Sequence, residues 1–179
     1  MKTRPMPASE FDLKPVDFEW YALYTKGRHE KLIDRDLKRK NIESFLPLRK
    51  IKKRWSDRVM TVEEPLFKSY IFVKTDLAHT LNVLRIKGAV KFVSIQGSPV
   101  PVGEKIILSL KHLVSQDIRI DPFPYLGLGD RVSVCSGIFK GIEGYILRKD
   151  DQKCRLVISI DAMMASVSVE VDSCLVEKV

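Results

Sequence analysis

Apolar residues recur along the chain with two different periods, and the change of period divides it in two. Over 19–115 the pattern predicts alternating strands and helices. Asp76 is a candidate N-cap for the helix expected at 77–87. A loop is expected over 97–101. The predicted strands are 20–25, 44–51, 69–75 and 89–95, and the predicted helices are 28–41, 77–87 and 103–115.

A basic stretch follows the second predicted strand. It reads KKRWSDR over 52–58, and Ser56-Asp57 is a turn signal. Residues 49–64 are therefore predicted to form a β-hairpin with a basic arm. Strand 69–75, SYIFVKT, is nearly all β-branched or aromatic, which predicts a central strand buried on both faces.

Beyond residue 128 the pattern becomes almost purely alternating. Residues 116–128 hold two prolines without a period and are expected to be a linker. Short alternating strands then predict a small β-barrel that closes its own edges. The expected fold class is thus α+β: a leader over 1–18, a sandwich of antiparallel sheet and helices over 19–115, the linker 116–128, and a barrel over 129–179. The alternating positions are Val132, Val134, Leu156, Ile158, Ile160, Val167, Val169 and Val171.

Positive charge is concentrated in the first half. The net charge is +8, and residues 1–118 hold 23 Lys/Arg against 14 Asp/Glu, whereas residues 119–179 hold 8 against 9. A basic first half indicates contact with a polyanion. The open alternative is a solvated basic face with no partner.

Several functional classes are disfavoured by the sequence. No apolar run approaches the roughly 20 residues that a membrane span needs, and the first residues lack the apolar core of a signal peptide, so a cytoplasmic protein is expected. Three cysteines and three histidines show no metal-ligand spacing, so neither a metal nor a cofactor is expected. No nucleophile–base pair, phosphate loop or paired carboxylates stand in a catalytic frame, which argues against an enzyme.

A glycine-rich segment opens the predicted barrel. It reads GDRVSVCSGIFKGIEGYI over 129–146 and resembles a KOW motif. Gly137 and Gly141 are expected to adopt positive φ, and Gly144 to permit close approach of a neighbouring backbone. Phe139 is expected at a loop tip, where an apolar side chain suits a partner's pocket. The alternative is that Phe139 folds inward and caps the barrel.

Residues 19–115 carry a second resemblance. This part of the chain resembles the N-terminal domain of the NusG family in three segments, WYALYTKGRHEK, EPLFKSYIFVKTD and GAVKFVSI. The spacing in the EPLF segment is closer to the specialised RfaH and UpxY-like members of the family. The resemblance implies a monomeric factor that binds RNA polymerase, bridges its clamp and opposite pincer, and suppresses pausing or termination. It implies clamp contacts on one sheet face through Tyr24, Phe67 and Phe92, and pincer contacts through His79 and Thr80.

The same resemblance implies contact with the non-template DNA strand. The matching positions are all basic, which suits a contact with phosphates, whereas Asp36 and Ile86 replace residues that read bases in RfaH. These basic positions are Lys26, Arg39, Lys40 and Lys87.

For the C-terminal half, the resemblance implies a β-barrel that recruits the NusE ribosomal protein through Ile138, Phe139 and Ile142. Contact with the termination factor Rho is less expected, because residues 163–166 replace the family's Gly-Arg pair. The abundance of Val and Ile predicts a barrel that stays β in every state. The open alternative is a ribosome-associated or RNA-binding KOW protein, against which the near-neutral charge of this half argues.

Overall fold

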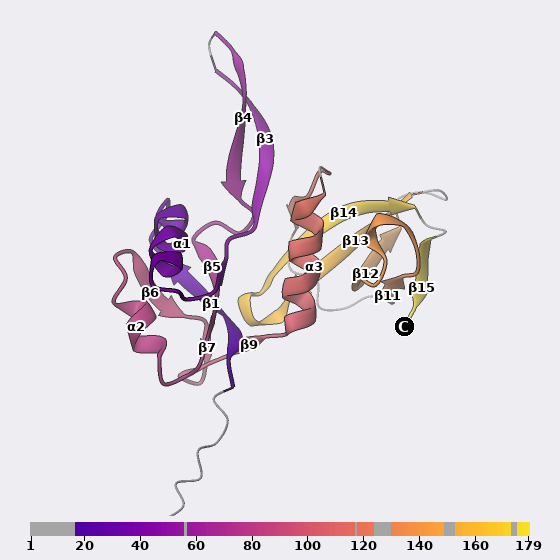
Figure 1. The fold of residues 1–179 in the computed structure, drawn as a ribbon. Helices are drawn as coiled ribbons and strands as arrows, with labels where there is room; N and C mark the ends of the chain where they lie inside the picture. Colours follow the sequence, from indigo (N-terminus) through magenta and orange to yellow (C-terminus); the bar gives the residue numbers. More distant parts are fainter. Residues whose placement is uncertain (1–16, 56, 117, 124–129, 149–152, 173–174) are drawn as a thin grey trace, which may run out of the picture.

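Two larger antiparallel sheets, two two-stranded sheets and three α-helices make up the described part of the chain (Figure 1). The computed structural model describes residues 17–55, 57–116, 118–123, 130–148, 153–172 and 175–179. The expected leader falls outside these residues, except for its last two positions. Among the described helices, none is long and apolar enough to cross a bilayer.

The first sheet has the order β2-β5-β1-β6, with β9 also paired to β1. Its centre is β5, where Ile71, Phe72 and Val73 are buried, which confirms the predicted central strand. Alternate side chains of a strand face opposite sides, so this sheet builds two cores. Its strands are β1 (Glu19–Thr25), β2 (Ser44–Phe45), β5 (Tyr70–Thr75), β6 (Ala89–Phe92) and β9 (Pro101–Val102).

One face of this sheet is covered by α1 (Glu30–Arg39) and α2 (Thr80–Leu84). The predicted stripe of α1 is confirmed, because Ile33 and Leu37 are fully buried against β1 and β5. The opposite face packs against α3 (Glu104–Ser115), which buries Ile107, Leu110 and Leu113.

A two-stranded arm stands away from this sheet (Figure 1). Its strands β3 (Leu48–Arg54) and β4 (Val59–Pro65) pair with each other from Leu48↔Pro65 to Arg54↔Val59. The predicted basic hairpin is thereby confirmed. Leu46 and Pro47 separate β3 from β2, so the single strand expected over 44–51 is two.

The second sheet holds six described strands in the order β10-β14-β13-β12-β11-β15. Its core comes from the alternating positions that the sequence indicated, such as Val132, Leu156 and Val167. Two 3-10 turns, η1 (Gly137–Phe139) and η2 (Asp161–Met163), lie within this region. The strands are β10 (Asp121–Phe123), β11 (Asp130–Val134), β12 (Glu143–Arg148), β13 (Lys153–Ile160), β14 (Ala165–Asp172) and β15 (Val176–Lys178).

Helix α3 lies between the two sheets (Figure 1), and one apolar cluster runs through it from Phe72 to Val169. Polar contacts join the same elements: the ring Nε2 of His112 is hydrogen-bonded to the carbonyl oxygen of Ile138, and Lys105 lies 4.0 Å from Glu143. The two halves therefore share a packed interface.

Three local expectations are wrong. Helix α2 is shorter than predicted and begins at Thr80. The expected loop 97–101 contains β8 (Ser98–Pro99), paired with β7 (Ser94–Ile95), and begins β9. In the expected linker, Asp121–Phe123 forms β10 and pairs with β14, because the extended chain there meets an open strand edge. Residues 117 and 124–128 lie outside the described part.

Candidate functional site

A row of aromatic side chains lies at one end of the first sheet. Tyr24 and Tyr70 are register partners on β1 and β5, with ring centroids 5.3 Å apart at an interplanar angle of 60°. Tyr24 is 37% exposed. Phe67 precedes β5 and is only 6% exposed, since its ring stands edge-on to Phe72 at 6.0 Å. The row thus presents Tyr24 to solvent, whereas Phe67 is buried against Phe72.

Phe92 does not belong to this row. It pairs with Leu23, whose side chain faces the side opposite to that of Tyr24. Phe92 is 4% exposed and packs edge-on to Tyr21 at 6.0 Å, within the core under α1 and α2. The expectation that Tyr24, Phe67 and Phe92 share one face is therefore wrong, because strand alternation places Phe92 on the other face.

His79 and Thr80 lie at the opposite end of the same strands. β5 ends at Thr75, the register partner of Glu19, and Asp76 follows. His79 donates its backbone N–H to Asp76 Oδ1 at 2.7 Å, and its ring Nδ1 lies 2.7 Å from Asp76 Oδ2. The hydrogen bond from His79 holds the pKa of the Asp76 carboxyl below its ordinary value, against the effect of burial. The carboxylate thereby positions the start of α2 and leaves the His79 ring largely exposed.

The four basic positions form two pairs and not one cluster. Lys26 donates its backbone N–H to Gly88 O at 2.8 Å, so it lies beside Lys87. Arg39 and Lys40 lie at the other end of α1, which is about 15 Å long by its ten residues. All four side chains are exposed. The structure therefore offers two separate cationic points on the α1–α2 side of the sheet.

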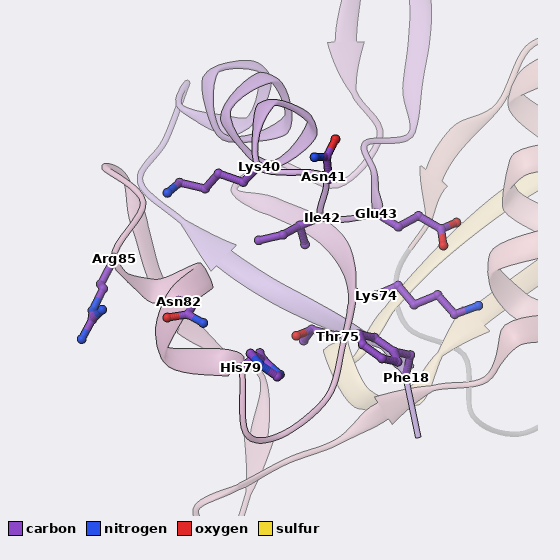
Figure 2. A pocket seen from close by; sticks show the side chains of 10 residues that line it. All are labelled: Phe18, Lys40, Asn41, Ile42, Glu43, Lys74, Thr75, His79, Asn82 and Arg85. Carbon is purple, nitrogen blue, oxygen red and sulfur yellow. The ribbon is translucent and has the colours of Figure 1, made fainter. Parts of the chain in front are cut away.

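A hollow of about 680 Å³ adjoins the second pair, and Figure 2 shows its lining. Lys40 and Arg85 lie on one side of the view, and Phe18 and Lys74 on the other. His79 also lines it. Arg85 adds a cation that the sequence reasoning missed. Its signal was a basic residue at the C-terminal end of the predicted helix, close to Lys87.

The C-terminal loop differs from its expected form. Gly137 and Gly141 have φ of 78° and 84°, as predicted. Phe139, however, is 6% exposed and Ile142 is buried, because the 3-10 turn η1 directs Phe139 inward. The expected exposed loop tip at Phe139 is wrong, and the inward alternative holds. Ile138 remains exposed while its carbonyl oxygen contacts His112.

The remaining titratable groups with displaced pKa values have structural causes. Burial, aided by the hydrogen bond to Glu19, raises the pKa of Tyr21 to about 12. A hydrogen bond from Lys53 lowers the pKa of Glu64. Within the described ranges, no three His, Cys, Asp or Glu side chains are grouped so as to hold a metal ion.

The comparison with protein families is decisive for identity. Residues 18–111 match the family described as transcription termination factor nusG. The chain belongs to the NusG family. NusG proteins that it resembles are named transcription termination/antitermination proteins: the one from Borreliella burgdorferi is 22% identical, with 89% of this chain and 98% of that protein covered. The one from Rickettsia felis is 25% identical, with 93% and 91% covered.

A solved structure supports the same fold. "Domain interaction in Thermotoga maritima NusG" matches at a TM-score of 0.55 and 22% identity, and the match covers 91% of this chain and 98% of that one. The NusG family consists of transcription factors, so this chain is a transcription termination/antitermination factor of that family. Sequence reasoning missed Tyr70 as the partner of Tyr24, since only the strand register brings the two together.

Proposed function

We propose that this NusG-family protein binds RNA polymerase during elongation, bridges the clamp and the opposite pincer, and suppresses pausing or termination. The observation that carries the proposal is the separation of two surfaces on one rigid strand pair. Tyr24 is paired with Tyr70 at one end of β5, and His79 follows the other end. The five residue steps from Tyr70 to Thr75 span about 17 Å. A factor that bridges the clamp and the opposite pincer needs two separated contact surfaces on a rigid part of its fold.

In this proposal the clamp contact is made by Tyr24 with Tyr70, and Phe67 supports them. The pincer contact is made by His79 and Thr80. Thr80 Oγ1 donates to Leu77 O at 2.8 Å, which stabilises the turn that presents His79. Phe92 acts only through the core beneath β1.

The DNA contact of the proposal uses the two cationic pairs. The phosphates of the non-template strand are bound at two points, which are separated by about the length of α1. One point is Lys26 with Lys87, and the other is Arg39 with Lys40. Arg85 extends the second point. Contacts of this kind position a strand without reading its sequence.

The C-terminal sheet is proposed to act as a KOW-type β-barrel that recruits the NusE ribosomal protein and stays β in every state. Ile138 is the exposed apolar residue of this loop, whereas Phe139 needs a rearrangement of η1 to reach a partner. Helix α3 contacts the same loop, because its His112 is hydrogen-bonded to the carbonyl oxygen of Ile138. We expect partner binding and α3 docking to compete for this loop.

The decisive experiment measures polymerase binding by the full chain. Tyr24→Ala should weaken it by about 1–3 kcal/mol, because an exposed aromatic anchor is lost. Tyr145→Ala in the C-terminal sheet is the matched control and should bind normally. Phe67→Ala is a poor test, since a buried Phe costs about 3–5 kcal/mol of folding free energy when truncated. Equal binding by both tyrosine variants, or co-purification with ribosomal subunits and not with polymerase, would contradict the proposal.

A further inference from the structure

The outer half of the β3–β4 arm, residues 52–61, carries side chains that the packing of the fold does not explain. The arm is anchored at its root, where Arg49 lies 3.1 Å from Asp121 and Lys31 lies 3.7 Å from Glu63. Beyond the root, every described residue from 52 to 61 is exposed. Figure 1 shows this half projecting past α1 into solvent. Its side chains therefore contribute little to the core, so folding does not account for their chemistry.

The outer half carries an excess of positive charge. It contains one acidic residue, Asp57, and four basic residues: Lys52, Lys53, Arg54 and Arg58. Lys53 is paired with Glu64. Among the described residues, the side chains of Lys52, Arg54 and Arg58 have no ion pair, so their charge is available to a partner.

The cations are arranged along one edge. Lys52 and Arg54 are two residues apart on β3, so their side chains leave the same face about 7 Å apart. Their register partners on β4 are Thr61 and Val59, which carry no charge. A regular cationic face without compensating acids fits a polyanion.

The tip adds apolar surface to this charge. Trp55 is 58% exposed, and Val59 and Met60 beside it are exposed as well. Trp55 donates its backbone N–H to Arg58 O at 2.8 Å, which brings the backbones of the two residues together. An exposed aromatic ring on an arm that also carries arginines suits bases and the sugars next to them.

The shape of the arm selects the form of nucleic acid. A two-stranded β-ribbon fits the major groove of B-form DNA, whereas the major groove of A-form RNA is too deep and narrow for side chains to reach. A ribbon in the groove places Lys52 and Arg54 of β3 near the phosphates of one rim. The apolar tip then meets base edges, including thymine methyl groups.

We propose that the β3–β4 arm is a duplex-DNA-binding element that enters the major groove, with Lys52, Arg54 and Arg58 on phosphates and Trp55 against base edges. This contact is separate from the single-strand contact of Lys26, Arg39, Lys40 and Lys87. It requires no polymerase, so it stands or fails independently of the proposed function.

The test uses the full chain and a short B-form duplex of mixed sequence, without polymerase. Lys52→Glu with Arg54→Glu should raise the Kd for the duplex at least about tenfold. The same change should lower the slope of log K against log salt concentration by about two units. The matched control, Lys140→Glu with Lys178→Glu, makes the same charge change on the C-terminal half and should keep the slope. Equal losses in the two double variants would overturn the proposal, because they would reduce the effect to net charge.

Tryptophan fluorescence gives a second readout on the unmodified protein. The chain has two tryptophans, and Trp20 is buried, so acrylamide quenching reports mainly on Trp55. Duplex DNA should protect Trp55 from acrylamide more than a duplex RNA or a single strand of the same sequence does. Trp55→Phe should abolish the protected signal. Stronger protection by the single strand, or by anionic lipid vesicles, would reject groove docking.

Discussion

His79 and Asp76 form a two-point contact at the start of α2. Asp76 Oδ1 accepts the backbone N–H of His79 at 2.7 Å, and the ring Nδ1 of the same histidine lies 2.8 Å from Oδ1 and 2.7 Å from Oδ2. The sequence indicated Asp76 as a cap for a helix that begins directly after it. In the structure α2 begins only at Thr80 with His79 as its N-cap residue, so the Asp76 carboxylate stabilises the turn before the helix and orients the exposed ring.

The first prediction concerns acid stability. Because its pKa is lowered in the folded state, Asp76 stabilises the fold at pH values above its ordinary range, and this contribution disappears as the pH falls through the lowered pKa. Asp76→Asn should be less stable than the wild type near neutrality and should lack this acid-dependent part. Chemical denaturation between neutral and acid pH measures both. Parallel pH profiles for the two proteins would contradict the prediction.

The second prediction concerns alkaline pH. The pKa of Tyr21 is raised to about 12, chiefly by burial and then by Glu19. A raised pKa means that the stabilisation is present below the ordinary tyrosine range near 10 and is lost as the pH rises toward 12. Tyr21→Phe should therefore lose less stability than the wild type between these values. In the variant, the phenolate absorbance should show one fewer tyrosine that titrates at high pH. An unchanged titration curve would mean that Tyr21 is not the tyrosine with the raised pKa.

The third prediction concerns Gly144. A Cβ at this position would lie 2.5 Å from the backbone oxygen of Val157 on the neighbouring strand, as the expected close approach implies. Gly144→Ala should lower the free energy of unfolding by about 1–3 kcal/mol, since β12 and β13 must separate. Gly27→Ala is the control, because its nearest neighbour would be Ser69 Oγ at 3.8 Å. Thermal denaturation compares them, and similar melting temperatures would refute the steric explanation.

The fourth prediction concerns the interface between α3 and the C-terminal sheet. His112→Ala removes the hydrogen bond to the carbonyl oxygen of Ile138. Amide hydrogen exchange should become faster over 137–142 and stay unchanged in β5, because the loop loses a contact that the first sheet does not use. Ser115→Ala, which removes a hydrogen bond within α3, is the control. Faster exchange throughout the chain would indicate general destabilisation.

Much of the fold was predictable because its signals are local. The aromatic and β-branched run of β5, the stripe of Ile33 and Leu37, and the basic hairpin each lie within a short window, and the structure confirms them. The strand pairing of Asp121–Phe123 was not predictable, since it depends on β14, which is distant in the sequence.

The candidate site shows the same division. The sequence predicted Tyr24, His79 and the four basic positions as contacts, and these stay predictions, although the matched range of the family contains all of them. It did not distinguish the two faces of β1 and β6, so Phe92 was placed with Tyr24. It also missed that Tyr70 lies beside Tyr24 and that Arg85 lines the same hollow as Lys40, because register and the packing of α2 decide both.

By itself, the sequence determined the family, the two periods of the chain and the basic character of its first half, because residue types and spacing carry these properties. Only the tertiary structure decided which face each aromatic occupies, that Phe139 points inward, and that α3 lies between the two sheets. The physical reason is that these outcomes depend on which distant surfaces bury each other. A strand or turn that suits either face locally is directed to one of them by the packing of the whole chain.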